Sequence, residues 1–391
     1  METNPSDQPT QKSLKRLIPS FALSPFQLSL IASVLVLCVI IGFAYVMKDK
    51  TEQTLAARGP TAVITISNEV VDKDQSPDAK IETAEEVSED PTLKESLSND
   101  STKSPLPDSP MPGVYENSDD GYLPAISKDG LKPYKAYAKP SKLYANIPKI
   151  SIILTEIGFN KEVNEKIMST LSNRITLSVT PYAENLNQIT NAFRQSGFEF
   201  LIELPVESTH FPKDDSGPYS LLSHVDPSMN LKRLKWNMTR TTGYIGFATF
   251  KESRLVSISS LIEPVLDEIQ HRGLLFASVT DSREDNNIDA LADKISLPFI
   301  PITSEIDTIL SEEFINSSLK ELELHSLKEG HVVAYAHSSP LTLKLLADWI
   351  TTLEGKGIAL VPASAYDIEK EDKEKKPQSA DTTVKQEDKS K

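Results

Sequence analysis

The sequence predicts an α/β domain of the β/α-barrel type, displayed beyond a membrane anchor and a flexible stalk. Three observations support this prediction: a long uncharged apolar run near the N-terminus, a polar stretch after it, and a region where short β-rich runs alternate with helical periodicity. We expect an N-terminal tail at 1–25, an anchor at 26–47, a disordered stalk at 48–146, the α/β domain at 147–365 and a disordered charged tail at 366–391.

The apolar run indicates a single transmembrane helix. No charged residue lies between Leu17 and Met47, and Phe26 to Met47 is almost wholly apolar. This length matches the roughly 20 residues that cross about 30 Å of hydrocarbon. A cleaved signal peptide, whose apolar region spans about 7–15 residues, and a buried core helix are the alternatives. Lysine and arginine are balanced on the two sides, so charge alone leaves the orientation open.

Composition excludes several classes of function. The net charge of −15 argues against nucleic-acid binding, which needs a basic patch. The one cysteine, Cys38, lies inside the expected anchor, so the domain has neither disulfide nor cysteine metal site. A lumenal enzyme of an oxidising compartment would usually carry disulfides. A bacterial inner-membrane protein with its domain in the periplasm fits better.

The polar segments on both sides of the domain predict disorder. The stretch after the anchor is rich in Ser, Pro, Asp, Glu, Lys and Thr and poor in aromatic residues. Such a segment buries too little apolar surface to offset the entropy lost on ordering. The segment after the anchor could be a stalk that extends the domain away from the membrane, or a segment without a function of its own. Both interpretations predict the same flexibility.

Eight apolar runs in the domain are candidate strands. Several are continuously β-rich, as expected where both faces of a parallel sheet are buried. They are Lys149–Leu154, Ile175–Val179, Phe198–Leu204, Gly243–Ala248, Leu274–Val279, Pro298–Ile302, His331–Ala336 and Ile358–Val361.

Glycines mark the passage from helix to strand. Gly197, Gly273, Gly330 and Gly357 each follow a predicted helix and precede a predicted strand, the C-terminal position where positive φ favours glycine. The recurring order predicts βα units around a parallel sheet. A doubly wound open sheet is the alternative, and the strand count near eight favours a barrel.

Sites in β/α folds form at the carboxyl ends of strands. Polar residues at these ends could gather at one mouth of the barrel. Their carboxylate and imidazole groups are ligands for zinc or a similar ion. His337 is the best placed of them because it ends an apolar strand. Those that could converge are Glu156, Glu207, His210, Asp281 and His337. Nucleotide-binding loops and the HExxH zinc motif are absent from the sequence.

Several segments, taken in order, resemble the divergent polysaccharide deacetylases, relatives of the NodB-like carbohydrate esterases. The resemblance covers nearly all of 147–364. Its motifs are Ile150 to Gly158, Thr176 to Ala183, Phe200 to Glu207, the Gly217-Pro218 pair, Asp281-Ser282-Arg283, His337 with Pro340 and Thr342, and Leu360 to Ser364. The resemblance implies a deformed β/α barrel, an envelope location and metal-dependent N-deacetylation of glycans, in which the metal activates water and a carboxylate moves the proton.

The residues that the family uses for chemistry are altered here. Thr155-Glu156 stands at the family's Asp-Asp pair, Phe247 stands at a metal-binding histidine, and Glu203 replaces another histidine. Phenylalanine has no lone pair for a metal. Transferred to this sequence, the resemblance implies catalysis by Glu156 and Glu207 and a possible metal bound by Glu156 and His337. It implies substrate binding by Tyr182, Glu203, Phe247 and Asp281.

Three hypotheses follow. In the first, the barrel is a pseudoenzyme that binds a cell-envelope glycan or an envelope protein and holds no cofactor. In the second, it is an active carbohydrate N-deacetylase with a rebuilt zinc or similar site that uses Glu156, Glu203, Glu207 and His337. In the third, it is a structural envelope protein. Rings at the mouth, from Tyr182, Phe247 and Phe250, would stack on sugars in the first reading.

Overall fold

The computed structural model describes residues 104–142, 146–250, 253–280 and 287–370. The expected anchor at 26–47 lies outside them. Within the described ranges, no helix combines the length and the apolar character that a membrane crossing requires.

A parallel sheet forms the centre of the domain. Its strands follow the order β8-β7-β6-β5-β4-β3-β10-β9, and β11 pairs with the start of β3. Each of the eight predicted strands is present. The bounds are β3 (Lys149–Ile157), β4 (Thr176–Val179), β5 (Phe200–Glu203), β6 (Gly246–Thr249), β7 (Leu275–Val279), β8 (Phe299–Ile302), β9 (Ser304–Glu305), β10 (His331–His337) and β11 (Ala359–Leu360).

The sheet nearly closes on itself through β8 and β9. These two strands are consecutive in the chain, yet β8 pairs with β7 and β9 pairs with β10. Between them, the Thr303 backbone N–H donates to the Val333 carbonyl at 2.9 Å. One chain segment thus joins both edges of the sheet, and the barrel prediction is confirmed in preference to an open sheet.

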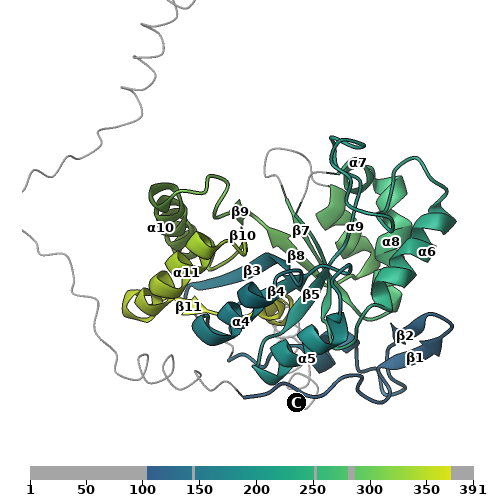
Figure 1. The fold of residues 1–391 in the computed structure, drawn as a ribbon, viewed down its shortest axis with the longest axis horizontal. Helices are drawn as coiled ribbons and strands as arrows, with labels where there is room; N and C mark the ends of the chain where they lie inside the picture. Colours follow the sequence, from purple (N-terminus) through teal and green to yellow (C-terminus); the bar gives the residue numbers. More distant parts are fainter. Residues whose placement is uncertain (1–103, 143–145, 251–252, 281–286, 371–391) are drawn as a thin grey trace, which may run out of the picture. The chain divides into compact units, whose positions relative to one another are not determined.

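Helices surround the strands on the outside (Figure 1). The bounds are α4 (Lys161–Thr170), α5 (Leu186–Gln195), α6 (Pro227–Met238), α7 (Arg254–Ser257), α8 (Ser259–His271), α9 (Asn287–Ile295), α10 (Glu312–Glu329) and α11 (Pro340–Leu353). A 3-10 turn, η1 (Glu354–Lys356), follows α11.

Alternation along the strands creates two apolar layers. Successive side chains of a strand point to opposite faces. On β5, Phe200 and Ile202 join the cluster shared with the helices, and Leu201 joins the second cluster. That second cluster fills the barrel and contains Tyr134 and Tyr137 from the segment before β3.

The expected stalk extends too far toward the domain. Its last part, 104–142, is folded into β1 (Tyr115–Ser118), β2 (Gly121–Pro124) and α3 (Pro133–Tyr137). Tyr134 is fully buried, and its backbone N–H donates to Gly273 at the start of β7. Disorder was therefore the wrong prediction for this part, because Tyr134 and Tyr137 are buried at the amino end of the barrel. We call 104–142 the strap.

The expected disordered tail also begins too early. Residues 364–370 are helical. The Tyr134 hydroxyl donates to Asp367 at 3.0 Å, and Lys149 pairs with Glu369 at 3.4 Å with both side chains about nine-tenths buried. This short helix packs at the amino ends of the strands beside the strap. The rest of the expected tail, after residue 370, lies outside the described residues.

A buried arginine holds the strap in place. Arg194 on α5 is 2% exposed, and its guanidinium donates to the carbonyls of Pro107, Tyr137 and Gly243. The same group lies 5.0 Å from the Tyr137 ring. Burial lowers the pKa of Arg194 to about 10, so the side chain stays charged at neutral pH.

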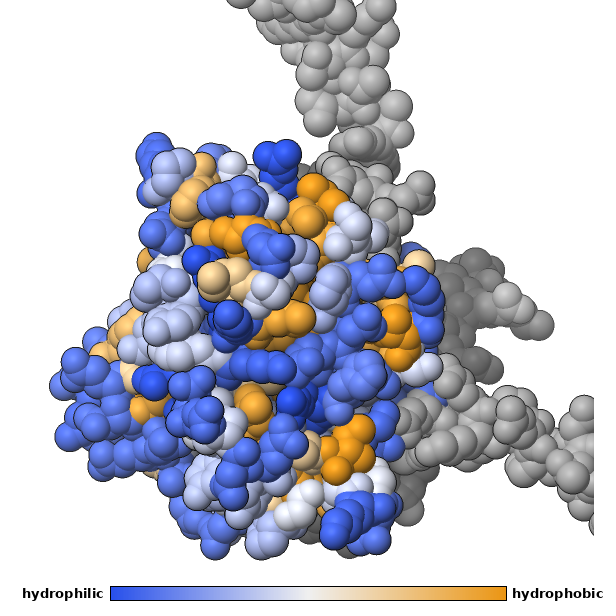
Figure 2. Space-filling model, turned by 90° about the vertical axis from the view of Figure 1, so that its right-hand side faces the viewer, coloured by the Kyte–Doolittle hydropathy of each residue, from blue (hydrophilic) through white to orange (hydrophobic). Residues whose placement is uncertain are grey.

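The outer surface beside α6 and α8 is mainly hydrophilic, with separate small hydrophobic areas between the polar side chains (Figure 2). Scattered apolar residues are ordinary on a protein surface. This face therefore gives no reason to place a site there.

We expect Arg194→Met to lower the free energy of unfolding by about 3 kcal/mol, because the buried carbonyls of Tyr137 and Gly243 would lose their donor. Urea unfolding of the full chain measures this change. Lys166→Ala, on the exposed face of α4, is the control. Limited proteolysis should cut the strap faster in Arg194→Met, and an unchanged midpoint with a protected strap would contradict this role.

Candidate functional site at the barrel mouth

A carboxylate–imidazole pair lies at the carboxyl end of β10. His337 Nδ1 is 2.9 Å from Asp307 Oδ1, and the His337 backbone N–H also donates to the Asp307 carboxylate. The Thr342 hydroxyl, on the first turn of α11, donates to Asp307 Oδ2 at 2.6 Å. Asp307 therefore fixes the ring through Nδ1 and leaves Nε2 as the nitrogen for other contacts. We call Asp307 and His337 the dyad.

The two members of the dyad differ in exposure. The Asp307 side chain is 1% exposed and that of His337 is 33% exposed. Burial alone would raise the pKa of Asp307, but hydrogen bonds from His337 and Thr342 outweigh it and lower that pKa. The hydrogen bond with Asp307 raises the pKa of His337 above its ordinary value, against the opposing effect of burial.

Two further carboxylates surround the imidazole. Glu305 lies 3.9 Å from His337 Nδ1, and the charges of Glu156 and Glu305 add to the increase in the pKa of His337. Burial and a hydrogen bond with Glu305 raise the pKa of Tyr335. The mouth is therefore an acidic setting that favours the protonated imidazole.

Glu156 lies at this mouth, as predicted. It has a left-handed backbone, with φ of 61°, where the pairing of β3 and β4 shifts register. Its carbonyl accepts a hydrogen bond from the Ser338 hydroxyl at 3.0 Å, which ties it to the residue after His337. Its side chain is exposed, and its backbone departs from regular strand geometry. The structure thus brings together Glu156 and His337, whose catalytic and metal-binding roles stay predictions.

Glu203 and Glu207 both have partners within the protein. Glu203 ends β5, is partly buried, and accepts a hydrogen bond from Thr155 at 3.1 Å. Glu207 accepts from the backbone and the hydroxyl of Ser223. Burial acts to raise the pKa of Glu207, but hydrogen bonds from Ser223 and His224 outweigh it and lower the pKa. Glu207 thereby holds the loop after β5, an arrangement that accounts for its burial without catalysis.

One of the predicted substrate-binding rings, Phe247, lies away from the mouth, and the other, Tyr182, is held by neighbours within the protein. Phe247 is fully buried against Tyr244 in the layer between sheet and helices, so the mouth prediction for Phe247 was wrong. It occupies that face because strand alternation turns it outward. The Tyr182 hydroxyl accepts from the Tyr219 backbone, and its ring lies 5.8 Å from Trp236.

Three predicted residues remain, Phe250, His210 and Asp281. Phe250 packs on Tyr335 with ring centroids 5.1 Å apart. Tyr335 packs edge to face with the His337 ring, with centroids 5.7 Å apart, so Phe250 does reach the mouth. His210 is exposed on the loop after β5. Asp281 lies outside the described residues.

Sequence reasoning missed Asp307 and Glu305. Both follow the predicted strand at 298–302, and the polar residues from Thr303 to Asp307 at its carboxyl end are the sequence signal for them. The structure shows that Asp307 contacts His337.

A metal bound through Nδ1 of His337 and through Asp307 fits this cluster poorly, whereas Nε2 of His337 is left available to an ion. Glu305, Asp307 and His337 offer ligand atoms within 4.8 Å of one another. However, Nδ1 of His337 already bonds to Asp307, and the Asp307 oxygens accept from His337 and Thr342 in a nearly solvent-free position. A metal bound through Nδ1 would have to displace these bonds.

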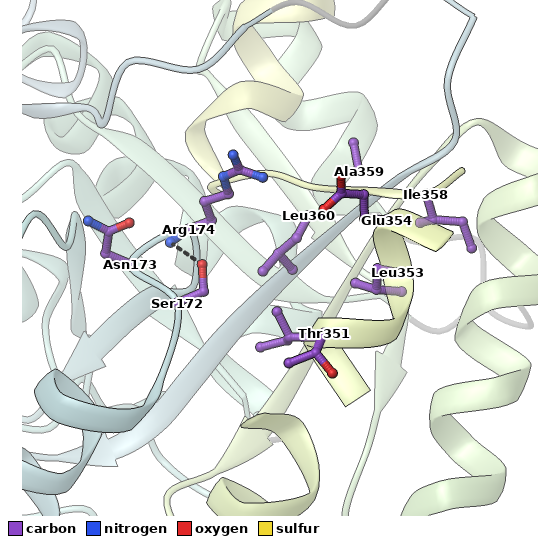
Figure 3. A pocket seen from close by; sticks show the side chains of 10 residues that line it. Ser172, Asn173, Arg174, Thr351, Leu353, Glu354, Ile358, Ala359 and Leu360 are labelled. Atoms are coloured by element: carbon purple, nitrogen blue, oxygen red, sulfur yellow. Dashed lines mark hydrogen bonds between the residues drawn. The ribbon is translucent and has the colours of Figure 1, made fainter. Parts of the chain in front are cut away.

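A separate hollow lies at the opposite end of the strands. Its volume is about 280 Å³, and Ser172, Asn173 and Arg174 face Thr351 and Leu353 across it (Figure 3). Leu360, which also lines it, pairs with Ile150 near the start of β3. This hollow is therefore at the amino end of the barrel, away from the dyad.

We expect the dyad to make stability depend on pH. A raised pKa in the folded state means that the protonated His337 stabilises the fold fully below its ordinary pKa of 6.5, and this contribution is lost as pH rises through the raised value. The difference in unfolding free energy between the parent and His337→Gln should therefore shrink as pH rises above 6.5.

NMR titration of His337 gives a direct check. Asp307→Asn should lower the pKa of His337 relative to the parent, because the main cause of the increase is removed. The exposed His325 serves as the reference imidazole, and an unchanged His337 titration in Asp307→Asn would contradict the dyad.

Comparison with known proteins places the chain in a family. An uncharacterized protein of Agrobacterium tumefaciens C58 is similar in structure, with a TM-score of 0.60 and 27% identity over 63% of this chain and 99% of that chain. Orotidine 5'-monophosphate decarboxylase of Methanocaldococcus jannaschii (TM-score 0.31, 11% identity, 53% of this chain and 99% of that one) is too distant to support an argument.

Triosephosphate isomerase of Bartonella henselae is similarly distant, with a TM-score of 0.30 and 14% identity over 52% of this chain and 99% of that one. No protein of curated function matches the chain. The family description "divergent polysaccharide deacetylase" matches residues 152–366, which is more than half of the sequence. The chain belongs to the divergent polysaccharide deacetylase family.

Proposed function

We propose that this protein is an anchored cell-envelope protein whose barrel mouth binds a glycan, and that it has lost the metal-dependent deacetylation expected from the family resemblance. The anchor at 26–47 would hold it in a bacterial inner membrane with the domain in the periplasm. The dyad is the observation that carries the proposal, since Asp307 is fully engaged by His337 and Thr342.

The loss of the expected ligands supports the same conclusion. Phe247 is buried in the core at the position of a metal-binding histidine, and Glu203 is held by Thr155. The conventional site thus lacks a nitrogen ligand. What the mouth retains is a partly exposed imidazole surrounded by carboxylates, which offers a ring nitrogen and several acceptors for sugar hydroxyl and acetamide groups.

The Glu305, Asp307 and His337 cluster favours one alternative, an active hydrolase with a rebuilt metal centre. In that alternative His337 and Glu305 would hold the ion, and the dyad bonds would have to rearrange. The glycan-binding proposal requires no such rearrangement.

Elemental analysis separates the two functions. We expect the full chain, purified without chelator, to carry no stoichiometric zinc, and acetate release from an N-acetylated chito-oligosaccharide to stay at background. One equivalent of metal in the parent and in the exposed control His325→Ala, lost in His337→Ala, would establish the hydrolase instead.

Calorimetry tests binding at the mouth. We expect the β-1,4-linked disaccharide of N-acetylglucosamine to bind the full chain, and His337→Ala to weaken that binding by about tenfold, because a hydrogen bond from a charged donor is worth about 1.5 kcal/mol or more. Equal affinity in parent and variant would exclude His337 from the binding surface.

A further inference from the structure

A groove between α4 and α5 lies beside the mouth. It has a volume of about 730 Å³. Its lining is mixed, with rings and methyl-bearing side chains on its walls and carboxamides along its length. The members used below are Phe159, Asn164, Tyr182, Asn185 and Gln188.

The groove is continuous with the mouth through the chain itself. Ser338, next to His337, donates to the carbonyl of Glu156, and Gly158 two residues later lines the groove. Gly158 has φ of 124°, and a Cβ there would come within 2.9 Å of Ala183. The close packing of these two segments forms the shared border of mouth and groove.

Two carboxamides of the groove are available to a ligand. Asn164 is not one of them, because it is 5% exposed and its Oδ1 is closed off from solvent. Asn185 precedes α5 in a left-handed conformation and makes no capping bond with its side chain. Gln188 is exposed one turn further along.

The chemistry of the groove selects a neutral ligand. Lys161 and Glu165 face each other at 3.7 Å, so Glu184 is the one charge of the lining without a countercharge in it. A polyanion would find no net positive charge here. Phe159, 71% exposed at the border with the mouth, offers a ring face of the kind on which a sugar ring packs.

We propose that this groove is a subsite for an extended, neutral, N-acetylated glycan, which continues from the mouth along α4 and α5. The proposal rests on the proposed function, because the mouth must bind the first sugars. Phe159 packs against one sugar ring, and the carboxamides of Asn185 and Gln188 exchange hydrogen bonds with hydroxyl and acetamide groups of the next.

Affinity as a function of glycan length tests the groove. We expect the full chain to bind the hexasaccharide of β-1,4-linked N-acetylglucosamine about tenfold more tightly than the disaccharide, a factor equal to about 1.4 kcal/mol. Phe159→Ala and Gln188→Ala should remove most of this difference and leave disaccharide affinity unchanged. Both side chains are exposed, so neither substitution removes core packing, and circular dichroism checks the fold.

Leu327→Ala is the matched control, because Leu327 is 58% exposed on α10, outside the groove. Equal affinities for the two sugars in the parent, or a length preference retained in both groove variants, would overturn the groove while the mouth still binds the disaccharide. Binding of neither sugar would overturn the proposed function together with the groove. Preference for a hexasaccharide of uronic acid over the neutral one would overturn the inferred ligand class.

Discussion

The buried Arg194 guanidinium and Glu199 carboxylate hold the base of the barrel together. Glu199 is fully buried and accepts from the Lys139 backbone, the Thr176 hydroxyl and the Ser364 hydroxyl, at distances of 2.6 to 2.8 Å. Arg194 binds carbonyls of the strap and of the turn before β6. A buried charge is tolerable only when it is fully hydrogen-bonded. The strap, the sheet and the helix at 364–370 therefore all pack around these two side chains.

This base leaves the carboxyl ends of the strands free to vary. Stability is concentrated at the amino end of the barrel, whereas the mouth carries the left-handed Glu156 and the dyad. β/α barrels divide the two tasks in this way, so substitutions at the mouth need not threaten the fold.

Much of the architecture was predictable from sequence because the barrel depends on regular local patterns. The continuous run Lys149–Leu154 predicted a strand buried on both faces, and Gly197 predicted the end of α5; both predictions are confirmed. The strap was not predicted, since the burial of its tyrosines depends on contacts with distant segments. Asp307 was missed for a similar reason, because its partner His337 lies 30 residues further along the chain. Composition likewise could not show that Glu207 is held by Ser223.

The kinked segment formed by β8 and β9 has a consequence for how the mouth comes into existence. It carries Glu305 and leads directly into Asp307, while its backbone joins β7 to β10. Closure of the sheet and orientation of the His337 imidazole therefore depend on the same short stretch of chain, so a change in this stretch would alter the sheet and the mouth together.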